Sequence, residues 1–144
     1  IKQTKKSKNI KPLAVNVRFK SPLESFLKIE YNQKGVTFKY KGKLPLKAAA
    51  SGKIVYKGVL SNFGNVLMID HGKQTRTIIL GKFSSNSKKG SVVKKGQILG
   101  YTRGSRLKEE KLYFEVRKKN KVQNTFQLIE RKSLANNQQS NDNT

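Results

Sequence analysis

The clearest alternation of hydrophobic and polar residues lies between residues 111 and 117. Leu112, Phe114 and Val116 are each flanked by polar or charged residues. A period of two residues is typical of a strand with one buried face and one exposed face. The pattern therefore predicts a strand that turns Lys111, Tyr113, Glu115 and Arg117 to one side.

Similar alternation fills much of the chain between residues 12 and 130, and no long segment shows the period of an α-helix. Turn residues, mainly glycine, asparagine and serine, separate the alternating runs. We therefore expect an all-β domain over residues 12–130, folded as a compact antiparallel β-sandwich with short helices or none. The expected strands include residues 15–19, 27–31, 36–40, 54–58, 65–70 and 75–80.

The two ends of the chain differ from this central region in composition. Residues 1–11 contain five lysines and few apolar residues, so we expect a disordered basic leader. Residues 131–144 are rich in Asn, Gln and Ser, and we expect a disordered polar tail. Because the first residue is Ile and not Met, a signal or anchoring segment is expected upstream.

Positive charge dominates the composition. The 144 residues include 32 Lys and Arg but 8 Asp and Glu, which gives a formal net charge of +24. Such a charge attracts nucleic acids, anionic lipid head groups and acidic polymers of a cell envelope. The absence of cysteine excludes disulfides and thiolate metal sites. No apolar run reaches the roughly 18–20 residues that a membrane-spanning helix needs.

Few side chains are suited to catalysis. The single histidine, His71, falls in an expected turn, where we predict a structural role. Glu109 and Glu110 are adjacent and therefore point apart, and no pair of acids has the spacing of a two-carboxylate hydrolase. The sequence also lacks a nucleophilic serine motif and a glycine-rich phosphate-binding loop.

Six short motifs, taken together, resemble those of one known family. They are Phe19-x-x-Pro22, Lys34-Gly35-Val36, and the runs 45–58, 63–72, 90–100 and 112–117. Their order is that of LytM-type, lysostaphin-like metallopeptidase domains, and they cover about three quarters of the chain. The resemblance implies the β-sandwich of that family, which is of the barrel-sandwich hybrid type.

The same resemblance implies that the catalytic site is lost. Active members hold zinc through a His and an Asp on an early strand and through the second His of a His-x-His motif, and two further His serve the reaction. None of the residues at these positions here is a His, Asp, Glu or Cys, the donors that zinc prefers. We therefore expect a degenerate member with no metal, no cofactor and no enzymatic activity. The five positions are Gln33, Thr37, Tyr113, Lys111 and Gly81.

Within the family, the chain is most similar to the metal-free, EnvC-like amidase activators. In that branch the former catalytic groove binds a regulatory segment of a peptidoglycan (N-acetylmuramoyl-L-alanine) amidase and draws it away from the amidase active site. The resemblance implies a protein of the bacterial periplasm or cell envelope that activates such an amidase during cell separation. The groove residues expected to contact the amidase are Lys34, Thr37, Phe63, Ile79, Lys111, Tyr113, Glu115 and Arg117.

Two other functions are consistent with the sequence. The positive charge could bind peptidoglycan or another anionic envelope polymer without an amidase partner, and such binding would weaken steeply with added salt. Aromatic residues beside lysines, as at Phe38 and Tyr40, could stack on nucleic-acid bases. The order of the six motifs argues against a nucleic-acid-binding barrel.

Overall fold

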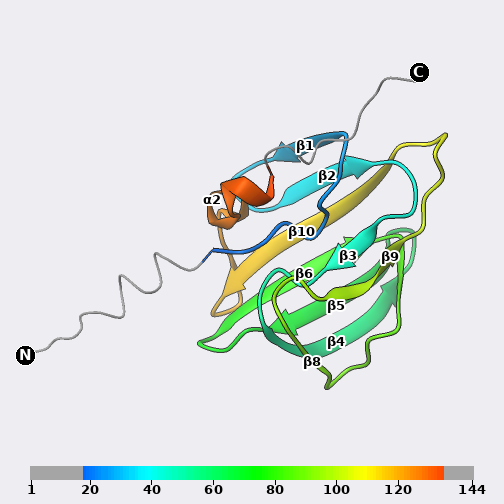
Figure 1. The fold of residues 1–144 in the computed structure, drawn as a ribbon. Helices are drawn as coiled ribbons and strands as arrows, with labels where there is room; N and C mark the ends of the chain where they lie inside the picture. The colour runs from blue at the N-terminus through cyan, green and yellow to red at the C-terminus, as the bar shows by residue number, and fades with distance from the viewer. Residues whose placement is uncertain (1–17, 135–144) are drawn as a thin grey trace, which may run out of the picture.

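Two antiparallel β-sheets make up most of the computed structural model, which describes residues 18–134 (Figure 1). The larger sheet has the strand order β1-β2-β10-β6-β5-β4-β8, and β11 pairs with the end of β10. Its strands are β1 (Lys28–Tyr31), β2 (Val36–Tyr40), β4 (Gly52–Leu60), β5 (Gly64–Asp70), β6 (Thr75–Gly81), β8 (Val92–Val93), β10 (Glu110–Lys118) and β11 (Lys121–Val122).

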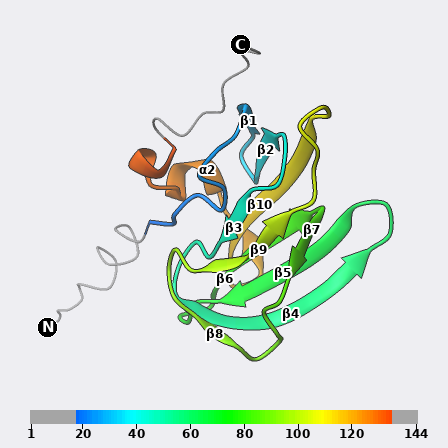
Figure 2. The same cartoon turned by 45° about the vertical axis from the view of Figure 1, so that its right-hand side comes forward.

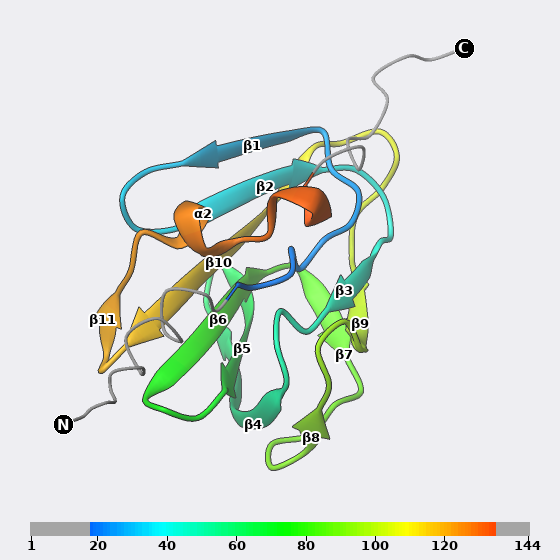
Figure 3. The ribbon, with the colours of Figure 1, turned by 60° about the vertical axis from the view of Figure 1, so that its left-hand side comes forward.

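The smaller sheet packs against one face of the larger sheet (Figure 2). It has the order β3-β9-β7, formed by β3 (Pro45–Lys47), β9 (Ile98–Thr102) and β7 (Phe83–Ser85). Helix α2 (Thr125–Leu128) and the 3-10 helix η1 (Arg131–Ser133) follow β11 and lie beside β1 and β2 (Figure 3). The predicted antiparallel sandwich with short helices is confirmed. Neither helix is long enough or apolar enough to cross a membrane.

The hydrophobic core lies between the two layers, and alternation in the central strands supplies it. Leu112, Phe114 and Val116 of β10 are fully buried, as are Val36 and Phe38 of β2. Fully burying one such side chain contributes about 1.5–3 kcal/mol. The inner residues therefore fix the register of these strands, and the alternate residues must point to the opposite face. We call that opposite face of the larger sheet the outer face.

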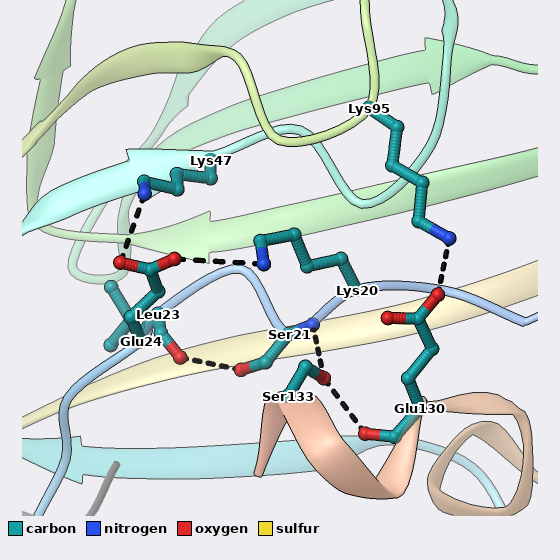
Figure 4. A network of polar contacts seen from close by, with 8 residues as sticks. All are labelled: Lys20, Ser21, Leu23, Glu24, Lys47, Lys95, Glu130 and Ser133. Carbon is teal, nitrogen blue, oxygen red and sulfur yellow. Dashed lines mark hydrogen bonds and ion pairs between the residues drawn. The ribbon is translucent and has the colours of Figure 1, made fainter.

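A network of polar contacts joins the segment before β1 to the C-terminal helices (Figure 4). The backbone N–H of Ser21 donates to Ser133 Oγ at 3.0 Å, and Ser133 Oγ donates to the Glu130 carbonyl at 2.8 Å. Glu24 pairs with Lys47 at 2.9 Å, but the half-exposed carboxylate makes this pair worth only about 0–1 kcal/mol. The buried serine contacts are therefore the stronger constraint at this junction.

The predicted ends of the domain need correction. Residues 131–144 were expected to be disordered, but Arg131–Ser133 form η1, because the Ser133 side chain is buried against Ser21. The strand expected at 15–19 is not formed at Phe19, which makes only an isolated parallel bridge with Ile129. The expected leader (1–11), residues 12–17 and residues 135–144 lie outside the described part of the chain.

His71 occupies the turn after β5 and has the structural contacts expected of it. Its Nδ1 lies 2.7 Å from the Ser51 carbonyl oxygen, its Nε2 lies 2.8 Å from Thr77 Oγ1, and its ring packs on Phe19. Burial lowers the pKa of His71, and the hydrogen bond to Ser51 and the charge of Asp70 oppose this only in part. The folded protein therefore favours the neutral imidazole.

We predict that acid destabilises the protein through His71. Below the ordinary histidine pKa of about 6.5, the unfolded chain binds a proton more readily than the folded chain, so the free energy of unfolding falls. Urea unfolding at about pH 7.5 and about pH 5.5 measures this loss, which should be smaller in His71→Gln. An equal loss in the variant would contradict the assignment. Glu24 and Glu30 also titrate in acid, but not in the same pH range as His71. Hydrogen bonds from Lys47 and Lys39 lower the pKa values of these two carboxyl groups, so their protonation occurs at lower pH than that of His71.

Candidate functional site

Side chains from β2, β10 and β6 meet at the middle of the outer face. Tyr113 on β10 is paired with Thr37 on β2 and with Leu80 on β6, and Glu115 is paired with Ile78. Directly opposed residues of antiparallel strands point to the same side of the sheet. These five residues therefore form one surface, which we call the central patch.

Tyr113 lies over the loop between β1 and β2. A Cβ atom built on Gly35 would overlap the hydroxyl and the ring of Tyr113, so only glycine at this position leaves room for the phenol. Gly35 has no unusual backbone angle, and its requirement is one of space alone. The Lys34-Gly35-Val36 motif is thus tied physically to the tyrosine on β10.

Glu115 is buried although the alternation of β10 places it on the outer face. Its side chain is only 8% exposed. Tyr113 Oη donates a hydrogen bond to one carboxylate oxygen at 2.7 Å, and Arg117 Nε donates to the other. A buried charge is tolerated when it is paired in this way.

These contacts also set the ionisation of Tyr113. Burial of the phenol, the hydrogen bond to Glu115 and the negative charge of Glu115 all raise the pKa of Tyr113, and the charge of Arg117 opposes them in part. The phenol therefore stays protonated and acts as a hydrogen-bond donor. The carboxylate holds the tyrosine ring in one position on the outer face.

Two shallow depressions flank the central patch. One, of about 330 Å³, has Phe63, Lys82 and Lys111 among its lining residues. The other, of about 660 Å³, lies at the opposite end of β6 and β10 and is lined in part by Arg76 and Arg117. The outer face thus has a partly apolar middle, with lysines and two glutamates, Glu109 and Glu110, at one end and mainly cations at the other. Phe63 is 64% exposed, so it lies open at the rim.

The residues predicted for the groove are only partly brought together. Thr37, Lys111 and Tyr113 share the outer face. Gln33 and Lys34 are exposed in the loop between β1 and β2, and so belong to its edge. The backbone N–H of Lys34 donates to Asn32 Oδ1, and its carbonyl accepts from Thr125, so this loop is held on both sides.

One residue of β6 predicted for the groove, Ile79, lies on the wrong face. Ile79 is fully buried in the core and is paired with Phe114. A Cβ atom on Gly81 would lie 3.0 Å from Cδ1 of the buried Leu112, so position 81 also points inward. A shift of one residue along a strand moves each side chain to the opposite face, and the prediction for β6 was off by that one residue.

The residues of β6 that contribute to the outer face are Ile78 and Leu80, and Lys82 follows them beside Lys111. The run of three apolar residues at 78–80 conceals which ones point inward. Arg76 shows which residues of β6 point outward, because an arginine on a strand of this sheet is expected to face solvent. Counting from Arg76 in steps of two gives the outer residues.

The side chains at the positions that the resemblance matches to zinc ligands do not suit zinc. An amide, a hydroxyl and a phenol, from Gln33, Thr37 and Tyr113, are poor donors for this ion, and the Tyr113 hydroxyl is already committed to Glu115. Within residues 18–134, no group of three His, Cys, Asp or Glu side chains is placed to hold a metal.

Comparison with known proteins identifies the family. Residues 31–125, which include the central patch, match the model of peptidase family M23. The chain belongs to peptidase family M23. This match confirms the LytM-type resemblance and agrees with the antiparallel all-β fold of the domain.

Individual M23 relatives extend the comparison. The domain is 30% identical over 122 residues to the outer membrane antigenic lipoprotein B of Haemophilus influenzae, covering 78% of this chain and 29% of that protein. Csd3 of Helicobacter pylori is 26% identical with a TM-score of 0.62, covering 79% of this chain and 35% of the Csd3 chain. The chain therefore spans about a third of these relatives.

A third match shares the fold alone. A chain from the crystal structure of the SpoIIIAH and SpoIIQ complex is 19% identical, with a TM-score of 0.60. The match covers 76% of this chain and 98% of that chain. The fold described here therefore accounts for almost the whole of that chain.

We predict that Gly35→Ala destabilises the protein through Tyr113. The added methyl group collides with the phenol, and such overpacking typically costs about 1–3 kcal/mol. In a Tyr113→Ala background the space is free, so the same substitution should cost less than about 1 kcal/mol. Urea unfolding of the four proteins gives the coupling energy. Equal costs in the two backgrounds would show that the ring does not lie over Gly35.

Proposed function

We propose that this M23 domain is a non-catalytic regulator of the bacterial cell envelope, which binds and activates a peptidoglycan amidase through its outer face. The observation that carries the proposal is the Tyr113–Glu115 contact. At a position where active members of the family have a zinc ligand, a phenol is hydrogen-bonded to a buried carboxylate. The residues that replace the reaction centre thus form a fixed surface.

The chemistry of this surface suits an amphipathic helical segment of a partner. Ile78, Leu80 and the ring of Tyr113 offer apolar contacts at the middle of the outer face. Lys111 and Arg117 lie beyond them on the same side of β10, where they can meet acidic residues of the segment. Aromatic residues held in one conformation are frequent anchors of such interfaces, because little entropy is lost on binding.

Two relatives support the location and the kind of partner. The relative in Haemophilus influenzae is named an outer membrane lipoprotein. A chain with the same fold comes from a complex named for two proteins, SpoIIIAH and SpoIIQ. We extend an envelope location and a protein partner to this chain as parts of the proposal.

We predict that Tyr113→Ala weakens amidase activation. The assay measures dye release from labelled peptidoglycan by the purified amidases of the same organism, with and without this domain. Loss of a central aromatic anchor costs about 2 kcal/mol or more, so the concentration needed for half-maximal stimulation should rise about 30-fold or more. Tyr101→Ala is the matched control, because Tyr101 is a partly exposed tyrosine on the smaller sheet. Unchanged stimulation by Tyr113→Ala would overturn the groove assignment.

We also predict that the domain alone does not cleave peptidoglycan when zinc is supplied. The side chains of Gln33, Thr37 and Tyr113 cannot replace the imidazole and carboxylate donors that a catalytic zinc needs. The measurement is dye release by the isolated domain with added zinc, compared with lysostaphin as the positive control. Zinc-dependent release that is lost in Tyr113→Ala would contradict the non-catalytic assignment.

A further inference from the structure

Strained backbone is concentrated at one end of the outer face. Five non-glycine residues within 18–134 have positive φ, and four of them lie in two turns. Lys73 (52°) and Gln74 (62°) are in the turn between β5 and β6, and Lys119 (51°) and Asn120 (65°) form the turn between β10 and β11. The backbone N–H of Lys119 donates to the Gln74 carbonyl at 2.9 Å, so the two turns are joined.

The geometry of the turns requires positive φ values, but it does not require lysine at these positions. Lys118 pairs with Lys121, so residues 119 and 120 form a two-residue hairpin turn, which usually contains Asn and Gly. A side chain larger than glycine in the left-handed region costs about 1–2 kcal/mol, and Asn and Asp tolerate it best. Such strain at clustered positions is a reason to look for a function.

Both lysines border the depression of about 660 Å³ described above. Arg76 and Arg117 also line it, and each is held through its Nε, by Asp70 at 3.1 Å and by Glu115 respectively. The arginine side chains remain 45% and 42% exposed, and the terminal nitrogens of Arg117 make no hydrogen bond to the described residues. Lys73 and Lys119 are exposed, and neither forms an ion pair within residues 18–134.

Four cations thus surround one open depression, and only Asp70 and Glu115 offset their charge. Planar guanidinium groups and mobile lysines together match the several oxygens of a phosphate group. The remaining lining residues are Gly72, Gln74 and Asn120, and none of the lining side chains is apolar. Membrane-bound surfaces usually insert apolar residues, so this lining favours an anion in solution over a bilayer.

We propose that this depression, which we call the basic depression, binds phosphate groups of a soluble polyanion such as a phosphodiester-linked polymer. Lys73 and Lys119 add two cations to the arginines that Asp70 and Glu115 already position. The proposal does not rest on amidase activation, because Lys73 and Lys119 lie outside the central patch. It assigns a second binding site to the same face of the sheet.

The test variant is Lys73→Asn/Lys119→Asn, because asparagine keeps the left-handed turns and removes both charges. The probe is sodium tripolyphosphate, titrated calorimetrically at about 0.15 M salt. We expect affinity to fall about tenfold or more, whereas the free energy of unfolding should stay equal or rise because the strain is relieved. The control, Lys89→Asn/Lys108→Asn, removes the same charge from exposed loops and should lose less than about twofold.

Four results would contradict the proposal that the basic depression binds phosphate groups of a soluble polyanion. Equal losses in the two variants would mean that the overall charge of the chain, and not this depression, binds the probe. Undetectable binding by the unchanged protein would exclude the site, and a polyglutamate of equal charge that binds as tightly would exclude phosphate as the preferred group. Binding only to vesicles of phosphatidylglycerol would point to a membrane. Amidase stimulation by the turn variant should remain, so a failure here leaves the proposed regulatory function standing.

Discussion

The arrangement of the outer face depends on one buried carboxylate, that of Glu115. A charge that is almost fully covered needs paired donors, and Tyr113 and Arg117 supply them from the same strand. Removing a partner from such a buried charge typically costs about 3–5 kcal/mol. The charge of Glu115 therefore orients the tyrosine in the central patch and the arginine at the basic depression.

This constraint works because β10 cannot rotate or slip. It pairs with β2 on one side and with β6 on the other, and its residues Leu112, Phe114 and Val116 are locked into the core. The outer residues are thereby fixed, and Gly35 leaves the space that the Tyr113 ring fills. A surface held in one conformation loses little entropy when a partner binds.

Sequence patterns predicted much of this arrangement where alternation was strict. In the strand at 111–117, Leu112, Phe114 and Val116 point into the core as predicted. The family resemblance is confirmed, and His71 has the expected structural contacts. The pattern failed at β6, because three consecutive apolar residues conceal the inward and outward positions, so Ile79 was assigned to the wrong face. A period-two pattern also cannot show that Glu115 is buried, or that the Lys119 backbone contacts Gln74 in another hairpin. Those features arise only when distant segments pack together.

The most direct test of the docking surface is methyl NMR of the isotope-labelled domain during titration with the amidase. We expect the methyl signals of Ile78 and Leu80 in the central patch to shift or broaden. The signals of Ile98, which is partly exposed on the smaller sheet, should not change. Perturbation of Ile98 with no change at Ile78 and Leu80 would show that the outer face of the larger sheet is not the binding surface.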